Sequence, residues 1–450
     1  MLLLYRNLGV AIPYLQRMPP PDSTPSQSPV AALHQQYVRG ETTPTAVLDA
    51  ALAHSNANAN HNTFLAQDAA WSHAEAAHLR AEGIATQPLW GIPVSLKDCF
   101  DLTGFATTCG SSFYKQLHGI AAQDSAVAAR LRAAGAVITG KTHLHQLAYG
   151  ITGENRDFGD CLQPRDSRLL CGGSSSGAAA SVQEGSALAA IGTDTGGSIR
   201  TPAALCGLSG YRSSITLNTD ALWRGGAHLA PTFDTLGWLY RSLADGPLLG
   251  QALLDLPYAA APALASIKIG IPDAAFLHDC EPDVLATLEH WQSQLAAQGV
   301  RLERFDAALW HDALEIFAPI QASEAAALHQ GNFQHFEPAI AERLAWGAAF
   351  SAADIAALRQ RLATFREQTA ALFQRFDNLL LPCAPMSALY AGADHGTTRA
   401  RILRYTGPAS LCGNPAVTLA SPDRPGGLQL LGPLGSDATL LALSASLGSA

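Results

Sequence analysis

The chain carries two glycine–serine turns, CGGSSSG at residues 171–177 and GTDTGGSIR at residues 192–200. Small residues fill the segment between the turns, from Ala178 to Ala190. Small side chains at this density let the backbone approach closely whatever the turns hold. A flexible linker is the alternative, but the intervening segment is typical of a packed helix, which disfavours it. Serines in such turns can act as nucleophiles or form an anion cradle.

Length and composition indicate a folded protein with reduced cysteines. Of 450 residues, 48% are hydrophobic and only 14% are charged, which excludes a mostly disordered chain. The eight cysteines are scattered without a CxxC pair, which favours reduced thiols in a cytoplasmic protein over a disulfide framework or a zinc site. The net charge is −9 and no basic cluster stands out, so nucleic acid and anionic membranes are disfavoured as partners.

The N-terminus predicts neither a signal peptide nor a membrane anchor. Residues 1–27 form an irregular, proline-containing arm, and Arg6 and Pro13 interrupt the apolar stretch Met1–Leu15. No later segment is long and apolar enough to span a bilayer. We expect a soluble, cytoplasmic protein whose functional domain covers residues 28–450.

Short apolar strands alternate with helices along the chain, which is the pattern of an α/β fold. The pattern predicts strands at 91–98, 136–140, 267–271 and 300–305, and helices at 43–55, 67–82, 124–134 and 282–297. It also predicts several helices over 309–375, a strand ending at Pro382, a closing pair of strands at 417–419 and 428–431, and a final helix at 437–447. The absence of a repeat or linker favours one continuous domain.

Lysine usage singles out Lys97. The chain has only four lysines, and Lys97 is the one within an apolar run, GIPVSLKD at residues 91–98. Burial lowers the pKa of a lysine and can leave it as a neutral amine near neutral pH. Lys97 is therefore a candidate general base.

The second turn can combine a nucleophile with an oxyanion hole. Successive backbone N–H groups at Gly196-Gly197-Ser198 can stabilise a developing negative charge. A serine hydroxyl is a poor nucleophile until a base removes its proton, and no histidine adjoins this turn. Lys97 is the leading candidate for that base, with Ser174 able to pass a proton between the two.

These motifs closely resemble the amidase signature family. Ser174 and Ser198 are 24 positions apart (198 − 174), which is the spacing that the family uses, and Val94-Ser95-Leu96-Lys97-Asp98 is similar to the family's lysine strand. The resemblance is strongest over a core at about 90–240 and covers nearly the whole chain. Further similar segments are Pro202-Ala203, Cys206-Gly207, Asp234-Thr235-Leu236-Gly237, Gly413-Asn414-Pro415-Ala416 and Gly427 to Pro433.

The resemblance implies a Ser–cisSer–Lys triad in a central twisted mixed sheet flanked on both faces by helices. Ser198 would form the acyl-enzyme, Ser174 would relay a proton after a cis Gly173–Ser174 bond, and Lys97 would act as base and then acid. The N–H groups of Thr195, Gly196, Gly197 and Ser198 would form the oxyanion hole. No cofactor or metal is implied.

Three neighbouring residues are expected to support the triad. Arg200 is interpreted as ordering the loop by pairing with Asp194, and Ser175 as a hydrogen-bond partner of Lys97 or Ser174. Asp98 points to the opposite face of a regular strand from Lys97, which favours a structural role.

Three segments depart from the family pattern. Ser176 stands where glycine is frequent, and Thr142-His143-Leu144-His145-Gln146 replaces a segment that more often holds Asn and Glu. Gly210-Tyr211-Arg212-Ser213-Ser214 replaces the usual Lys-Pro-Thr after glycine. His143 and His145 could suggest a metal, but no carboxylate or cysteine cluster lies nearby in the sequence, so a metal site is not expected.

Competing motifs are weaker. Gly173 to Gly177 formally fits the G-x-S-x-G pattern of α/β-hydrolases with Ser175 as nucleophile, but Arg168 to Leu170 is a poor strand and the last histidine lies in a polar loop. Ser112-Phe113-Tyr114-Lys115 fits the S-x-x-K pattern of penicillin-binding enzymes without a companion motif.

We therefore expect a stand-alone hydrolase that cleaves the C–N bond of a small-molecule amide. Carbamate, ester or anilide hydrolysis with the same triad, a pseudo-enzyme binding module and an ammonia-releasing component of an amidotransferase remain open alternatives, as does a homodimer. We expect the substrate pocket within 144–149, 222–228 and 309–350, with Trp223, Phe317 and Phe333 as candidate walls.

Overall fold

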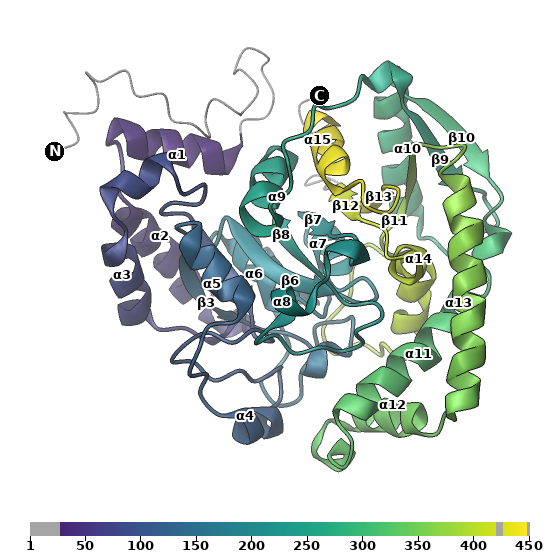
Figure 1. Ribbon diagram of the computed structural model, residues 1–450, viewed down its shortest axis with the longest axis horizontal. Helices are drawn as coiled ribbons and strands as arrows, with labels where there is room; N and C mark the ends of the chain where they lie inside the picture. Colours follow the sequence, from purple (N-terminus) through teal and green to yellow (C-terminus); the bar gives the residue numbers. More distant parts are fainter. Residues whose placement is uncertain (1–27, 420–425, 448–450) are drawn as a thin grey trace.

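A single mixed sheet of 11 strands forms the centre of the molecule (Figure 1). The computed structural model describes residues 28–419 and 426–447, so the predicted N-terminal arm at 1–27 lies outside the described residues. In sheet order the strands are β1 (Phe64–Ala66), β3 (Val137–Thr142), β2 (Pro93–Lys97), β6 (Ala189–Asp194), β8 (Thr235–Tyr240), β7 (Ser209–Arg212), β12 (Ala416–Leu419), β13 (Leu428–Leu431), β11 (Asn378–Pro382), β9 (Lys268–Pro272) and β10 (Arg301–Phe305).

Strand direction divides the sheet into three zones. Near one edge β2 runs parallel to both β3 and β6, and near the other edge β9 runs parallel to both β10 and β11. The strands between β6 and β11 pair antiparallel. The sheet is thus mixed, as the resemblance implied, and the α/β single-domain prediction is confirmed.

Alternating side chains of the central strands pack into two separate hydrophobic cores, one on each face of the sheet. Ala189 and Ile191 of β6 join the main core, whereas Ala190 between them packs with Ala178 and Val182 of α6 (Ser176–Glu184). This follows from the period of two along a strand. Helices therefore cover both faces.

The remaining helices are distributed along the sheet (Figure 1). The helices α1 (Pro29–Arg39), α2 (Pro44–Ala57) and α3 (Ala69–His78) lie at the β1 end, and α10 (Pro282–Ala297) and α13 (Ala352–Leu372) lie at the β10 end. Further helices are α4 (Ser112–His118), α5 (Ala126–Ala133), α7 (Arg200–Leu205), α9 (Gly246–Leu254), α11 (Ala313–Leu328), α12 (Pro338–Ala348), α14 (Thr398–Cys412) and α15 (Asp437–Leu447).

Most predicted elements are present. The bounds of α10 and α15 agree with the predicted helices, and Thr43 caps α2 by accepting a hydrogen bond from the Ala46 amide at 3.2 Å. Helix α14 was missed because Gly407 and Pro408, which usually interrupt helices, lie inside it.

One prediction about a strand is wrong. The segment judged a poor strand, Arg168 to Leu170, lies in β5 (Asp166–Leu170), which pairs with β4 (Leu162–Gln163). The two form a separate small sheet, so the cross-strand partner that stabilises β5 is supplied locally.

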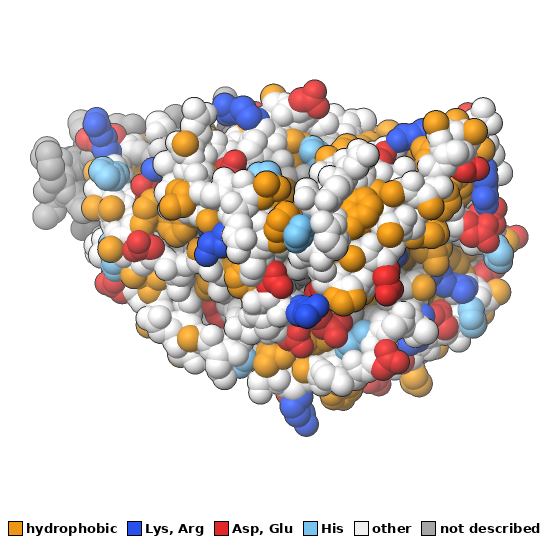
Figure 2. Space-filling model, turned by 90° about the horizontal axis from the view of Figure 1, so that it is seen from below, with side chains coloured by type: hydrophobic (Ala, Val, Ile, Leu, Met, Phe, Trp, Pro, Cys, Tyr) orange, Lys and Arg blue, Asp and Glu red, His pale blue; other side chains and the backbone are white. Residues whose placement is uncertain are grey.

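Surface charge is mixed on the face seen in Figure 2. There, among the described residues, Lys and Arg side chains are dispersed between acidic and hydrophobic ones and form no continuous basic patch. In the same described ranges, no helix combines the length and apolar character needed to cross a membrane.

Candidate active site

Neighbouring parallel strands bring Lys97 and Thr193 together. Lys97 ends β2, and Leu96 pairs with Ile191 of β6, so both side chains emerge at the same edge of the sheet. The Lys97 Nζ atom lies 2.8 Å from Thr193 Oγ1. Two more hydroxyls complete its surroundings, with Ser174 Oγ at 2.8 Å and Ser175 Oγ at 3.0 Å.

The environment of Lys97 favours its neutral form. The side chain is fully buried and forms no ion pair with any described carboxylate. Burial lowers the pKa of Lys97, and the more distant Cys99, Asp194 and Asp234 oppose this shift only in part. An amine with a lowered pKa and three hydroxyl partners is suited to accept a proton.

The hydroxyl protons around Lys97 can be assigned in part. Ser175 Oγ also lies 3.3 Å from the carbonyl oxygen of Thr193, to which it can only donate. Ser175 therefore accepts from Lys97. A neutral amine has two N–H donors and one lone pair, so one of its three partners must donate to it. Ser174 can do so, because its oxygen makes no hydrogen bond to a described residue other than Lys97.

Asp98, the residue after Lys97, forms an ion pair with a different lysine, Lys141. Its carboxylate lies 2.5 Å from Lys141 Nζ on β3, and both side chains are fully buried. The Thr108 amide and hydroxyl also donate to Asp98. Burial raises the pKa of Asp98, although Lys141 opposes the rise. The structure thus separates a catalytic candidate, Lys97, from a structural lysine, Lys141.

The two glycine–serine turns lie against each other. The Gly173–Ser174 peptide bond is cis, as the resemblance implied. The Ser175 amide donates to the Ser198 carbonyl at 3.1 Å, which joins the turns. No hydrogen bond links the Ser198 hydroxyl to Ser174 or to another described residue. Hydrogen bonds between catalytic groups are often incomplete in unliganded enzymes.

Close packing explains the paired glycines before Ser198. A Cβ atom on Gly196 would lie 2.8 Å from Leu403 Cδ2 and 2.9 Å from Phe317 Cζ. Gly197 has a φ of +120°, and a Cβ there would lie 2.8 Å from Thr406. Thr406 Oγ1 also donates to the Gly196 carbonyl at 2.6 Å. The turn therefore needs glycine at both positions.

Asp194 organises the second glycine–serine turn, which holds Ser198 (the nucleophile turn, residues 192–200). Its carboxylate accepts from the Gly197 amide at 2.8 Å and from the Ile199 amide at 3.2 Å. It also pairs with Arg200 at 2.9 Å, as expected, and with Arg212 at 2.8 Å, which the sequence did not indicate. Burial opposes ionisation of Asp194, but the two guanidiniums outweigh it and hold its pKa well below the usual range.

The Asp194 contact corrects the predicted oxyanion hole. Because the Gly197 amide already donates to Asp194, it is not free to bind an oxyanion. The amides of Thr195, Gly196 and Ser198 make no hydrogen bond to the described residues and remain available.

We expect Asp194→Asn to destabilise the protein strongly. The substitution leaves the buried Arg200 and Arg212 without a counter-ion, which costs about 3–5 kcal/mol when one partner of a buried pair is removed. Urea unfolding measures the change. Asp312→Asn is the control, because Asp312 pairs with Arg361 at an exposed site. A loss for Asp194→Asn no greater than that for the control would contradict the role of Asp194.

A second carboxylate supports the start of the turn. Asp234 accepts from Thr195 Oγ1 at 2.6 Å and lies 2.8 Å from His228 Nδ1. The amides of Leu229 and Ala230 also donate to it. Asp234 was quoted in the sequence only as part of a similar segment, and its contacts give it a positioning role.

Two of the three departures from the family pattern, at His143 and Ser176, contact each other. His143 Nδ1 lies 2.8 Å from Ser176 Oγ, and His143 Nε2 lies 2.8 Å from the Gly159 carbonyl. Both ring nitrogens are thus engaged by protein atoms, and burial lowers the pKa of His143 to about 4. His145 instead lies 3.2 Å from Glu337. Across residues 28–419 and 426–447, no cluster of three His, Cys, Asp or Glu side chains is arranged to hold a metal.

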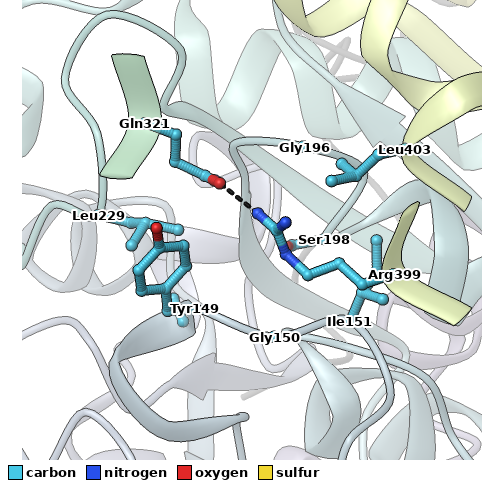
Figure 3. A pocket seen from close by; sticks show the side chains of 10 residues that line it. Tyr149, Gly150, Ile151, Gly196, Ser198, Leu229, Gln321, Arg399 and Leu403 are labelled. Carbon is cyan, nitrogen blue, oxygen red and sulfur yellow. Dashed lines mark hydrogen bonds between the residues drawn. The ribbon is translucent and has the colours of Figure 1, made fainter. Parts of the chain in front are cut away.

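A small pocket opens at Ser198 (Figure 3). Its empty volume is about 240 Å³, which includes space open to solvent. The residues that line it are Ala148, Tyr149, Gly150, Ile151, Gly196, Ser198, Leu229, Gln321, Arg399 and Leu403. The pocket therefore lies directly beside the candidate nucleophile.

The predicted pocket segments meet this pocket only in part. Tyr149 and Gln321 fall within the predicted ranges, but Arg399 and Leu403 come from α14, which the sequence did not indicate. The predicted aromatic walls are not among the lining residues. Phe317 instead packs beneath Gly196, and Trp223 stacks on His228 with ring centroids 4.1 Å apart. These rings belong to the packed interior, where aromatic side chains contribute large buried surfaces.

Comparisons with known proteins identify the family. Residues 45–441 match the sequence profile of the Amidase family. The chain is 31% identical over 435 residues to 2-amino-5-chloromuconic acid deaminase of Comamonas testosteroni, covering 90% of this chain and 92% of the relative. It is 30% identical over 472 residues to a component of the glutamyl-tRNA(Gln) amidotransferase of Synechococcus sp. (strain CC9605), with 92% and 94% covered. A crystal structure of an amidase superposes with a TM-score of 0.85 at 29% identity, covering 93% of this chain and 98% of that one. The chain therefore belongs to the amidase signature family of amide-cleaving hydrolases.

Proposed function

We propose that this chain hydrolyses a small-molecule amide through an acyl-enzyme at Ser198. The observation that carries the proposal is the buried Lys97, which three hydroxyls surround and no described carboxylate pairs. A structural lysine in the same interior, Lys141, has an aspartate partner. Lys97 thus has the environment of a base rather than that of a buried ion pair.

In the first half-reaction, Ser198 Oγ attacks the carbonyl carbon of the amide. Its proton passes to Ser174, whose own proton moves to the lone pair of Lys97. The carbonyl oxygen becomes an oxyanion, for which the free amides of Thr195, Gly196 and Ser198 are the candidate donors. Collapse of the tetrahedral intermediate breaks the C–N bond, and the Lys97 ammonium returns the proton to the leaving nitrogen through Ser174.

In the second half-reaction, water replaces the amine. Lys97 and Ser174 accept a proton from the water as it attacks the acyl-ester carbon. The second tetrahedral intermediate collapses with cleavage of the bond to Ser198 Oγ, which regains a proton. The products are the amine and the carboxylic acid.

Two other functions of the same site are alternatives to amide hydrolysis by a stand-alone enzyme. The similarity to a component of an amidotransferase supports an ammonia-releasing role within a complex, in which activity needs a partner chain and glutamine. Carbamate, ester and anilide cleavage would use the same acyl-enzyme. We favour a stand-alone enzyme, either a monomer or a homodimer, and the unpaired state of all eight cysteines supports a cytoplasmic setting.

We expect the purified chain to form a covalent adduct at Ser198 without any partner. Incubation with amide, carbamate, ester and anilide probes, acid quenching and peptide mass mapping should place an acyl group on the peptide that contains Ser198. Because the acyl-enzyme keeps only the acyl part, each probe carries a different acyl group, so that the added mass identifies the probe that reacted. Acylation only after addition of a second protein would support the amidotransferase alternative, and acylation of another residue would contradict the mechanism.

A further inference from the structure

The pocket beside Ser198 contains an arginine without a counter-ion. Arg399, in the first turn of α14, lines the pocket together with Ser198, and Figure 3 shows its guanidinium pointing into the space between Gln321 and Ser198. It donates to Gln321 Oε1 at 2.5 Å. Within the described ranges, no carboxylate forms an ion pair with it. The group therefore has N–H donors that protein atoms do not use.

Arg399 is partly exposed to solvent, whereas the two fully buried arginines among the described residues are paired. Arg200 and Arg212 both bind the carboxylate of Asp194. A guanidinium that has lost much of its contact with water is stabilised by a negative partner. Burial and the neighbouring Arg343 lower the pKa of Arg399 to about 10, so it still carries its charge at neutral pH. Packing alone does not explain a charged group in this position.

A second guanidinium, that of Arg343, contacts the lining residue Tyr149 from outside the pocket. Arg343 of α12 lies 5.5 Å and Arg399 lies 5.7 Å from the centroid of the Tyr149 ring. Arg343 donates to the Tyr149 carbonyl, and Glu337 and Glu342 oppose the lowering of its pKa by burial, whereas no carboxylate acts on Arg399 in this way. Contact with a tyrosine ring is a weak attraction for a cation and does not replace a carboxylate partner. A negative group from outside would remove the imbalance.

We infer that the substrate carries a carboxylate, which Arg399 binds while the amide lies at Ser198. The inference rests on the proposed function, because it assumes that Ser198 marks the reacting carbon. A planar guanidinium matches a carboxylate through two parallel hydrogen bonds. Arg399 has one nitrogen on Gln321, and its other N–H groups remain for the substrate. Neutral amides of the same shape would leave the arginine unpaired and bind more weakly.

The test measures binding in the Ser198→Ala protein, where turnover is blocked. Dissociation constants from NMR titration are compared within two isosteric pairs. Succinamate against succinamide places the carboxylate on the acyl side, and N-acetylglycine against N-acetylglycinamide places it on the leaving-group side. We expect the acid of at least one pair to bind about tenfold or more tightly than its neutral partner. The pair that shows this preference identifies the side of the amide that carries the carboxylate.

Substitutions then assign the preference to Arg399. Arg399→Gln should bring the acid-to-amide ratio close to one, and Arg399→Lys should retain part of it, since the charge remains without the planar fork. Arg401→Gln is the matched control, because Arg401 lies on the same helix but pairs with Asp279 away from the pocket. Equal binding of acid and amide in both pairs, or a preference that survives Arg399→Gln, would overturn the inference. Failure of the nucleophile assignment would appear separately, as unchanged activity of the Ser198→Ala protein.

Discussion

Replacement of Ser198 by alanine should lower amide turnover by about 10⁴-fold or more and abolish labelling by a fluorophosphonate. The probe forms a bond between serine oxygen and phosphorus with loss of fluoride, so it reports the nucleophile directly. Ser198 borders the small pocket at the end of the Gly196–Gly197 turn. The first glycine–serine turn contains serines as well, so the identity of the labelled residue shows which serine is the nucleophile. Gel fluorescence and amide hydrolysis measure the two effects.

Ser209→Ala is the matched control for this experiment. Ser209 is also buried, lies on β7 outside the site, and its hydroxyl has no partner among the described residues. Its removal should leave labelling and turnover within about threefold of the unmodified protein. The Ser209 hydroxyl makes no hydrogen bond to a described residue, so its loss breaks no interaction in the site. Retained labelling in Ser198→Ala would show that another residue, such as Ser175, is the nucleophile.

The two buried lysines should respond in opposite ways to replacement by methionine. Lys97→Met removes the base, so acylation should fall by about 10³-fold or more. The free energy of unfolding should change much less than for Lys141→Met, because removal of Lys97 breaks hydrogen bonds to three hydroxyls but leaves no buried carboxylate unpaired. Lys141→Met leaves Asp98 unpaired in the interior and should lower the free energy of unfolding by about 3–5 kcal/mol.

The pH dependence supplies a second measurement for Lys97. A base must be neutral to accept a proton, so kcat/KM should rise with pH through the pKa of Lys97 and then level off. Because burial lowers that pKa, the rise should lie below the ordinary value of 10.5. A rate that still climbs beyond the ordinary lysine value of 10.5, or a Lys97→Met protein with near-normal acylation at neutral pH, would refute the role of Lys97.

The sequence predicts the proposed reacting groups because they lie in short local patterns. Lys97 stands out as a lysine in an apolar run, and Ser174 and Ser198 lie in glycine turns whose spacing resembles a known family. Strand β2, the cis bond and the Arg200–Asp194 pair are all present in the structure. Each of these features depends on residues that are close in sequence or on one characteristic motif.

The residues that surround the reacting groups were missed for the opposite reason. Arg212 reaches Asp194 from β7, and Gln321 meets Arg399 across 78 positions of the chain. Neither contact has a local signature. Arg399 was harder still to identify, because its helix contains Gly407 and Pro408 and was not predicted from the sequence. Such contacts arise from the order of strands and helices in space, which periodicity along the chain does not specify.

Helix α14 separates two tasks along its length. Arg399 in its first turn faces the pocket, and Thr406, two turns later, donates to the carbonyl of Gly196 in the nucleophile turn. Leu403 lies between them and contacts both regions. With the roles proposed above, a new side chain at position 399 would change which substrates bind without moving the turn that holds Ser198. Substrate choice and the geometry of that turn would then depend on different residues of one helix.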